Sequence, residues 1–350
     1  MMRVVLFQNR IMEYRVPVFN RLNKHFDLTI IYTEGEVPCG CECITKRVPK
    51  KKGKLFWKFN ENIKKITEGY EVAILPMDLR QIDYLGLILT GRIKTISWGI
   101  GVNASYDTPF DSGKVSRLLK WIYIKKTDAC IFYSDYARQK YLDYVDKRKL
   151  FVADNTVEVN KISLDTEKTR LLFIGSLYKE KLIFELLYAY RDAYKECSDV
   201  QDLYIIGEGI ERDSIERFIN HNKLGDKIHL CGQIFDENTL AEMFRQSIAC
   251  ISPNQAGLSV LKSMGYGVCF ITHKNAITGG ERLNISNGIN GVLFEDFSNL
   301  KTILLDIANN PGKYIFLGEE AYQYYWHKRT PEHMVEGFVD AIEYVSGLKR

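Results

Sequence analysis

The residues with the clearest chemical potential lie at positions 250–273, where a short apolar run leads through a loop into a helix. The run ends at Ser252-Pro253, because proline has no amide proton to donate to a sheet ladder. Gly257 gives the loop conformational freedom, and Ser259 is expected at the N-cap or in the first turn of a helix that runs to about Met264. Free amides and the positive end of the helix dipole favour an anion at such a helix start. The stretch therefore predicts an anion site at the carboxyl end of a parallel strand, where open sheets bind their ligands.

Strands and helices are expected to alternate along the whole chain, which is typical of parallel sheets flanked by helices. Apolar runs in the first half predict strands at residues 4–8, 28–32, 72–75, 95–98, 129–133 and 150–153. Corresponding runs in the second half predict strands at residues 171–175, 203–207, 228–232, 249–251, 269–272 and 291–294. Helices are expected between them, at residues 17–25, 82–89, 115–126, 134–144, 181–196 and, with breaks near Pro311 and Pro331, 298–348. The predicted fold class is α/β, with two doubly wound, Rossmann-like parallel-sheet domains.

The length of 350 residues and a hydrophobic content of 46% suit two domains, each with its own core. The expected boundaries give a first domain at residues 1–165, a second at 166–315, and C-terminal helices at 316–350 that pack back toward the first domain. No apolar run approaches the roughly 18 residues that a membrane span needs, and no secretory leader is expected. The eight cysteines fit no paired framework, so reduced thiols in a cytoplasmic protein are expected. This includes the alternating cluster Cys39, Cys41 and Cys43, because no second ligand pair follows at zinc-site spacing.

The charge is distributed unevenly between the two halves. Residues 1–165 contain 28 Lys and Arg against 19 Asp and Glu, a net charge of +9, whereas residues 166–350 have a net charge of −5. Residues 46–58 concentrate this positive charge around Phe56-Trp57, which predicts contact with an anionic membrane surface. A solvated basic loop is the alternative, and no nucleic-acid partner is expected because no recognised binding motif accompanies the charge.

The stretch at 250–273 also resembles the donor-binding signature of retaining GT-B-fold glycosyltransferases. Gly257-Leu258, Met264 and Gly267 match that signature, and Asn254 and Lys262 stand where it has two glutamates. An ordinary strand–loop–helix of any doubly wound domain fits the same residues.

Further motifs extend the resemblance over nearly the whole chain. Phe7-Gln8, residues 14–17 and Ser97-Trp98-Gly99 are similar to segments of bacterial polysaccharide glycosyltransferases, with Ile100 in place of a histidine. Gly175-Ser176 with Lys181 resembles their Gly-Arg and Lys pair. The glycine-ended strands at 204–209 and 230–233 and a turn at 287–291, which is similar to their Asp-Gly-x-x-Gly turn, follow in the same order. The resemblance implies a family 4-like enzyme of the GT-B architecture, with two domains facing a cleft. It also implies a role in capsule or lipopolysaccharide O-antigen synthesis.

The resemblance assigns roles to residues around a UDP- or GDP-type nucleotide sugar. Lys181 would supply a point charge to the diphosphate, and Glu281 would be a carboxylate for the transferred sugar. Lys262 cannot accept hydrogen bonds from the ribose, so either the ribose is held differently or this lysine has moved onto a phosphate. No divalent metal is expected because no Asp-x-Asp follows a strand, and no cofactor is expected because the nucleotide sugar is a substrate. The expected donor residues are Gly175, Ser176, Lys181, Gly207, Glu208, Gly232, Gln233, Ile234, Asn254, Gln255, Ala256, Gly257, Leu258, Ser259 and Lys262.

The acceptor side is expected on the first domain. Asp107 or Asp111 would orient an acceptor hydroxyl, although both also fit as turn residues, and the other acceptor-side candidates are Arg10, Tyr14, Arg15 and Trp98. The implied acceptor is a lipid-linked saccharide at the inner face of the cell membrane, with the protein attached peripherally. Two other functions fit the same fold, because fold does not determine function. They are a sugar-nucleotide epimerase and a catalytically weak nucleotide-sugar-binding protein.

Overall fold

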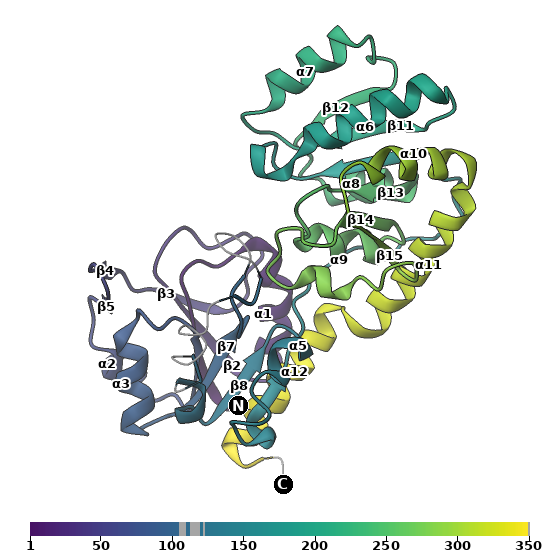
Figure 1. Ribbon diagram of the computed structural model, residues 1–350. Helices are drawn as coiled ribbons and strands as arrows, with labels where there is room; N and C mark the ends of the chain where they lie inside the picture. The colour runs from purple at the N-terminus through teal and green to yellow at the C-terminus, as the bar shows by residue number, and fades with distance from the viewer. Residues whose placement is uncertain (105–109, 113–119, 122, 349–350) are drawn as a thin grey trace. The chain divides into compact units, whose positions relative to one another are not determined.

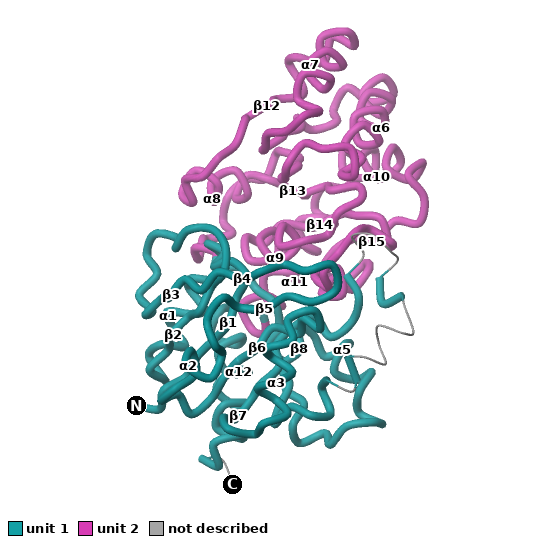
Figure 2. The backbone as a smooth tube through the Cα atoms, turned by 90° about the vertical axis from the view of Figure 1, so that its left-hand side faces the viewer, with its two compact units in different colours: residues 1–158, 329–350 teal, residues 159–328 magenta. Residues whose placement is uncertain are grey.

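The computed structural model describes residues 1–104, 110–112, 120–121 and 123–348. The chain forms two compact units, which Figure 2 distinguishes by colour. Unit 1 consists of residues 1–158 together with 329–350, and unit 2 consists of residues 159–328.

Unit 1 is built on a seven-stranded parallel sheet with the strand order β3-β2-β1-β6-β7-β8-β9 (Figure 1). These strands read as nearly continuous apolar runs because helices cover both faces of a parallel sheet. Side chains alternate between the faces, so that Val4 and Leu6 pack in one core and Val5 and Phe7 in the other. The strands are β1 Arg3–Gln8, β2 Asp27–Tyr32, β3 Ile44–Arg47, β6 Val72–Pro76, β7 Lys94–Gly99, β8 Ala129–Phe132 and β9 Leu150–Val152.

Helices from both ends of the chain cover unit 1. The core around Val4 contains residues of α1 (Val16–Asn23) and of α12 (Pro331–Ser346), and the core around Phe7 contains residues of α2 (Ile63–Ile66) and α3 (Ile82–Thr90). The short helix α5 (Asp135–Gln139) follows β8 and starts at Ser134, whose hydroxyl accepts a hydrogen bond from the amide of Ala137.

The basic stretch that the sequence suggested might be a loop forms regular structure instead. Strand β3 joins the edge of the sheet, and β4 (Lys50–Lys52) pairs with β5 (Trp57–Phe59) in an antiparallel hairpin. The buried side chains of Val48 and Phe59 hold this segment against unit 1, while most of its lysines are exposed.

Unit 2 is a six-stranded parallel sheet with the order β12-β11-β10-β13-β14-β15, which is the doubly wound order. Its strands are β10 Arg170–Ile174, β11 Asp202–Ile206, β12 Ile228–Gly232, β13 Ser247–Ile251, β14 Cys269–His273 and β15 Gly291–Phe294. Its helices are α6 Ile183–Glu196, α7 Arg212–His221, α8 Glu237–Arg245, α9 Leu258–Gly265, α10 Asn299–Asn309 and α11 Pro311–Lys328. The expected α/β class with two doubly wound parallel sheets is confirmed.

The unit boundaries differ from the expected positions 165/166 and 315/316. Residues 159–168 pack in unit 2, where the Lys168 ammonium donates to the carbonyl oxygen of Gly267 at 2.6 Å. Helix α11 also stays with unit 2, and the chain returns to unit 1 only at Arg329. Contacts with Gly267, in the turn between α9 and β14, explain both differences. Leu164 of the segment 159–168 and Tyr322 of α11 both pack against this glycine.

No helix in the described ranges combines the length and the apolar character needed to cross a bilayer.

Helix α12 lies directly on the backbone of strand β9, and this close approach generates a testable prediction. A β-carbon at Gly337 would overlap the carbonyl oxygen of Val152, whereas a β-carbon at Gly86 in α3 would meet no atom within 4 Å. We expect Gly337→Ala to lower the free energy of unfolding by about 1–3 kcal/mol through overpacking. The matched Gly86→Ala should be neutral or stabilising by about 0.5–1 kcal/mol. Urea unfolding followed by circular dichroism measures both, and equal stability of the two variants would contradict the packing of α12.

Candidate functional site

The candidate site of unit 2 lies at the carboxyl ends of β10 and β13. These strands are neighbours in the sheet although two strands and three α-helices separate them in the chain, so the connections leave them in opposite directions and open a crevice. The glycine that follows β10 and the one that follows β11 stack closely, since a β-carbon at Gly207 would overlap the carbonyl oxygen of Gly175. Gly207 has φ +143° and donates its amide to Gly232 at 2.8 Å. The three glycine-ended strands thus bring their loops to one edge of the sheet.

Lys181 extends into this edge from the turn Lys179–Lys181, which precedes α6. The predicted helix at 181–196 begins only at Ile183, because Leu182 has a left-handed φ of +52°. Lys181 is only 7% exposed, and its ammonium group lies so close to Gly175 that a β-carbon there would stand 2.7 Å away. Any larger residue at position 175 would displace the lysine.

Burial lowers the pKa of Lys181 to about 8, because the charged form loses its hydration. The nearby Cys250 acts to raise the pKa of Lys181, but this effect is smaller than that of burial. Lys181 forms no ion pair with a carboxylate in the described part of the chain. A buried cation without a counter-charge is costly, and an anionic ligand at this position would offset that cost.

The loop that follows β13 is tied to the loop that carries Lys181. Asn254 donates its side-chain amide to the carbonyl oxygen of Glu180 at 3.0 Å, and the Tyr178 hydroxyl donates to Gln255 Oε1 at 2.6 Å. Helix α9 follows this loop, with Gly257 at its N-cap and Ser259 in its first turn. Its first amides are not needed within the helix and can bind an anion. The structure therefore brings Gly175, Lys181, Asn254, Gln255, Ala256, Gly257, Leu258 and Ser259 to one crevice.

Glu281 lies beside this crevice on the loop after β14. Its side chain is 7% exposed, and one carboxylate oxygen accepts from the Gly279 amide at 3.0 Å and the Thr278 hydroxyl at 3.3 Å. The same hydroxyl also lies 2.8 Å from the carbonyl oxygen of Ala256. Glu281 is thus held in a fixed position next to the loop that carries Asn254 and Gln255.

Lys262 pairs with a carboxylate that the sequence analysis missed. Its ammonium group lies 2.8 Å from Glu237 at the start of α8, and the Tyr266 hydroxyl donates to the other oxygen of the same carboxylate. The sequence offered one signal for this carboxylate. Lys262 stands where a glutamate is expected, and a partly buried lysine needs a carboxylate nearby. The position of Glu237 in the sequence does not reveal that it is the partner.

The remaining donor candidates lie on more open loops. Ser176, Glu208 and Gln233 are exposed, and Ile234 is half-buried. Glu208 pairs with Arg212 at 2.7 Å. These residues follow β10, β11 and β12 in turn, so they line the same edge of the sheet as Lys181.

The acceptor-side candidates in unit 1 separate into buried and open residues. Trp98 is 2% exposed and packs its ring against Phe338 of α12, and Arg15 is 4% exposed with its guanidinium about 5 Å from the rings of Tyr14, Trp98 and Tyr133. These two residues therefore stabilise the interior of unit 1. Arg10 is exposed, and Tyr14 is half-buried.

Of the two acidic candidates on the acceptor side, the structure describes only Asp111. Asp107 lies outside the described residues. Asp111 accepts from the Tyr136 hydroxyl at 3.0 Å and lies 3.3 Å from the Lys140 ammonium, at a turn with φ +59°.

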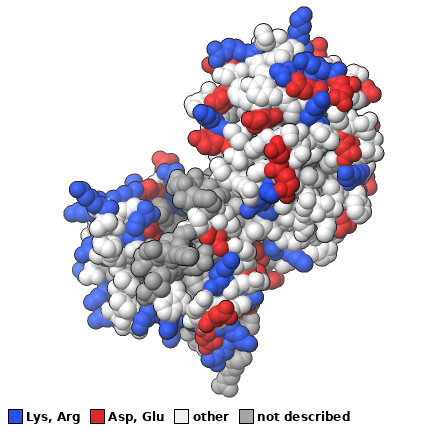
Figure 3. Space-filling view, in the orientation of Figure 1, with Lys and Arg blue, Asp and Glu red and all other residues white. Residues whose placement is uncertain are grey.

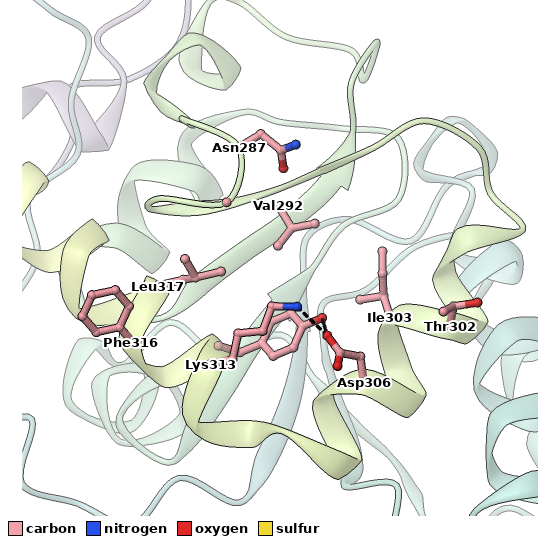
Figure 4. A pocket seen from close by; sticks show the side chains of 10 residues that line it. Asn287, Val292, Thr302, Ile303, Asp306, Lys313, Phe316 and Leu317 are labelled. Carbon is pink, nitrogen blue, oxygen red and sulfur yellow. Dashed lines mark hydrogen bonds and ion pairs between the residues drawn. The ribbon is translucent and has the colours of Figure 1, made fainter.

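A cavity of about 660 Å³ in unit 2 lies away from this crevice (Figure 4). It is lined by residues of β15, α10 and α11, and β15 is separated from β13 by β14. Its acidic group, Asp306, already accepts from Lys313 at 2.6 Å and from Tyr314 at 2.8 Å. The acidic group of this cavity is therefore already paired, and the candidate site that we consider further is the β10–β13 crevice.

Comparisons with known proteins agree with the geometry of unit 2. Residues 154–324 match the family model of glycosyl transferases group 1. An uncharacterized glycosyltransferase of Methanocaldococcus jannaschii is 23% identical over 61% of this chain, and the match spans 58% of that relative's length.

Solved structures show the fold over the full length of both chains. Anabaena HepE in complex with UDP superposes with a TM-score of 0.72 at 10% identity, over 98% of this chain and 100% of the other. A putative UDP-N-acetylglucosamine 2-epimerase from Listeria monocytogenes gives a TM-score of 0.69 at 15% identity, over 100% and 98%. The architecture is therefore the GT-B fold.

The shared carboxylate of Glu237 generates a prediction for the stability of unit 2. We expect Glu237→Ala to lower the free energy of unfolding by about 1–3 kcal/mol, because Lys262 and Tyr266 both lose their acceptor in a partly buried position. The control is Glu242→Ala on the same helix, where the exposed pair with Arg245 contributes at most about 1 kcal/mol. Thermal unfolding of the two variants is the measurement. A larger loss for Glu242→Ala would show that the Lys262 pairing does not stabilise the unit.

Proposed function

We propose that this chain, whose residues 154–324 match the glycosyl transferases group 1, is a retaining glycosyltransferase that uses a UDP- or GDP-type nucleotide sugar. The acceptor is a lipid-linked saccharide of a growing bacterial surface polysaccharide, such as a capsule or O-antigen. The observation that carries the proposal is the buried Lys181 ammonium group, which lacks a carboxylate partner among the described residues and lies at the switch point of unit 2.

The leaving group of such a transfer is a nucleoside diphosphate, and its developing negative charge needs stabilisation. Lys181 and the first amides of α9 supply positive charge and hydrogen-bond donors without a metal ion. Because the ammonium group is already buried, it needs no further desolvation when the substrate binds. Its interaction with the diphosphate is correspondingly strong in this dry environment.

The transferred sugar is held by the loop after β13 and by Glu281. Asn254 and Gln255 supply amide groups, and Glu281 supplies a fixed carboxylate next to Ala256. In a retaining transfer, the leaving phosphate takes the proton of the acceptor hydroxyl. The reaction therefore needs no side-chain base at position 100, where this chain has isoleucine instead of histidine. Glu237 adjoins the expected nucleoside loops and replaces the missing carboxylate at position 262 as an acceptor for ribose hydroxyls.

Peripheral attachment to the inner face of the membrane follows from the surface of unit 1. Lys51 and Lys58 face each other across the hairpin β4–β5, and Leu55 and Phe56 at its tip are 73% and 56% exposed. Exposed apolar side chains flanked by lysines suit an anionic lipid surface, where each lysine contributes about 1 kcal/mol.

An epimerase is the second candidate, and the likeness to the putative Listeria epimerase favours it over other enzymes of this architecture. Such an enzyme converts the nucleotide sugar without any acceptor. A catalytically weak binding protein would bind the nucleotide sugar without converting it.

The first prediction concerns the ammonium group of Lys181. We expect Lys181→Ala to weaken UDP binding by about 1–3 kcal/mol, the usual scale for a lost charged hydrogen bond. Because the pKa of Lys181 is lowered to about 8, its charge is present below that pH and is lost as the pH rises through it. The wild-type affinity for UDP should therefore fall roughly tenfold between pH 7 and pH 9.

Isothermal titration calorimetry at several pH values measures this effect. Lys181→Arg is the matched control, because arginine keeps its charge over the whole range and its pH profile should be flat. A wild-type profile as flat as that of the arginine variant would remove Lys181 from the site.

The second prediction concerns the reaction. With UDP- and GDP-sugars and a lipid-linked saccharide, we expect transfer with retention of the anomeric configuration, and EDTA should leave the rate unchanged. Product analysis by nuclear magnetic resonance gives the configuration. Conversion of the nucleotide sugar without acceptor would establish the epimerase instead, binding without turnover would establish a binding protein, and a strict Mg²⁺ or Mn²⁺ requirement would exclude the metal-free mechanism.

A further inference from the structure

Unit 1 has a switch point of its own, between β1 and β6. The strand order places these two strands side by side, with β2 and β3 on one side and β7 to β9 on the other. The loop after β1 contains Asn9 and Arg10, and the loop after β6 contains Asp78 and Arg80. Ligands of open parallel sheets bind at such a position.

Three cations surround one indole ring at this edge. The Trp57 centroid lies 4.3 Å from the Lys50 ammonium, 5.4 Å from the Lys52 ammonium and 3.9 Å from the Arg80 guanidinium. The amide of Trp57 donates to the carbonyl oxygen of Arg80 at 2.7 Å, which fixes the hairpin to the loop after β6. Cation–π attraction holds the three charges in place although they repel one another.

The register of the hairpin separates its lysines into two sets. Lys52 stands opposite Trp57 and Lys50 opposite the buried Phe59, so both lysines share the face of the ring. Lys51 stands opposite Lys58 on the other face. The alternation of the strands therefore directs two lysines to the switch point and two away from it.

The carboxylates nearby do not balance this charge. Lys52 pairs with Glu34 at 2.5 Å, and Arg80 pairs with Asp78 at 3.1 Å. Lys50 donates to the neutral amide oxygen of Asn9, and Arg10 lies against Gly35, where a β-carbon would stand 3.0 Å from its Nε.

Among the residues that the structure describes, Lys52 and Arg80 thus pair with a carboxylate, whereas Lys50 and Arg10 form no ion pair and leave two positive charges uncompensated. Lys52 and Lys50 both act to lower the pKa of the Glu34 carboxyl, so both lysines interact electrostatically with the same carboxylate. Lys and Arg side chains also gather over the β4–β5 end of unit 1 in the space-filling view (Figure 3).

We propose that Lys50, Lys52 and Arg80 around Trp57, together with Arg10 near Glu34, form a binding site for a phosphate or diphosphate group carried by the acceptor. This cluster, the Trp57 site, rests on the proposed function for the identity of the ligand as an acceptor. Two uncompensated charges match the charge of a phosphate ester, and the arginine forks offer paired donors to its oxygens. The site lies in unit 1 and uses no residue of the donor crevice.

The test measures pyrophosphate binding in a Lys181→Ala background, which removes the buried cation of unit 2. One variant carries Lys50→Gln and Lys52→Gln, and its matched control carries Lys51→Gln and Lys58→Gln. Both lose two charges from the same hairpin, so any effect of net charge is equal. We expect the Lys50/Lys52 variant to bind pyrophosphate at least roughly tenfold more weakly than the Lys51/Lys58 variant in calorimetry.

Equal affinity of the two variants would overturn the proposal. Should the Lys50/Lys52 variant fail to fold by circular dichroism, Arg80→Gln replaces it, with Arg92→Gln as its control. We expect Arg80→Gln to bind pyrophosphate more weakly than Arg92→Gln. Equal affinity of these two variants would overturn the proposal as well.

Vesicles identify the source of the phosphate. Wild type is sedimented with phosphatidylcholine vesicles that contain either a polyprenyl diphosphate or phosphatidylglycerol at matched surface charge. A preference for the polyprenyl diphosphate that depends on Lys50 and Lys52 assigns the phosphate to a lipid-linked acceptor. Pyrophosphate binding without this preference assigns it to a soluble phosphorylated acceptor.

The failure of this site and the failure of the proposed function are distinguishable. UDP affinity is measured with Lys181 intact, and the Lys50/Lys52 variant should keep the wild-type value. Loss of the pyrophosphate difference with UDP binding unchanged rejects the Trp57 site alone. Absence of UDP binding and of transfer rejects the glycosyltransferase and leaves an anion site that the pyrophosphate difference still supports.

Discussion

A buried ammonium group that forms no ion pair with any described carboxylate is the constraint around which unit 2 is arranged. Lys181 can occupy its place only because Gly175 has no side chain and because the left-handed Leu182 separates the lysine from α6. The bonds from Asn254 and Tyr178 then hold the loop after β13 against the turn that carries the lysine. The unit therefore buries this charge at a cost in stability, and the anion that we propose would offset that cost.

The alternation of apolar runs and glycines was sufficient to predict both sheets, because a buried parallel strand needs a continuous apolar run wherever it lies in the chain. It was insufficient for β3, β4 and β5, whose lysines conceal the strand pattern. Lys50 and Lys52 share the face of Trp57, so cation–aromatic contacts hold the hairpin together in addition to the buried Phe59. Unit boundaries escaped prediction for a related reason, since residues 159–168 have no regular pattern and belong to unit 2 through individual contacts.

The candidate site was predictable where backbone geometry defines it and unpredictable where side chains pair. Glycines and Pro253 mark the strand ends, and the parallel sheet brings these ends to one edge. The exchange of an expected glutamate for Lys262 is compensated by Glu237, 25 positions away, and only the fold brings the two together. Trp98 and Arg15 show the opposite case, because a tryptophan and an arginine near strand ends suggest ligand contacts, whereas aromatic packing buries both in the core of unit 1.

The two switch points carry positive charge in forms that suit different ligands. Unit 2 buries Lys181 beside Gly175, and burial lowers the pKa of this lysine to about 8, which suits a small group whose charge changes during a reaction, such as a diphosphate leaving group. Unit 1 spreads several cations around Trp57 and leaves their ends accessible, with Lys52 and Arg80 side chains 52% and 60% exposed. Exposed charges attract a ligand without requiring that it lose its hydration, and salt ions readily screen this attraction. Such a surface suits the reversible capture and release of the phosphorylated acceptor that we propose.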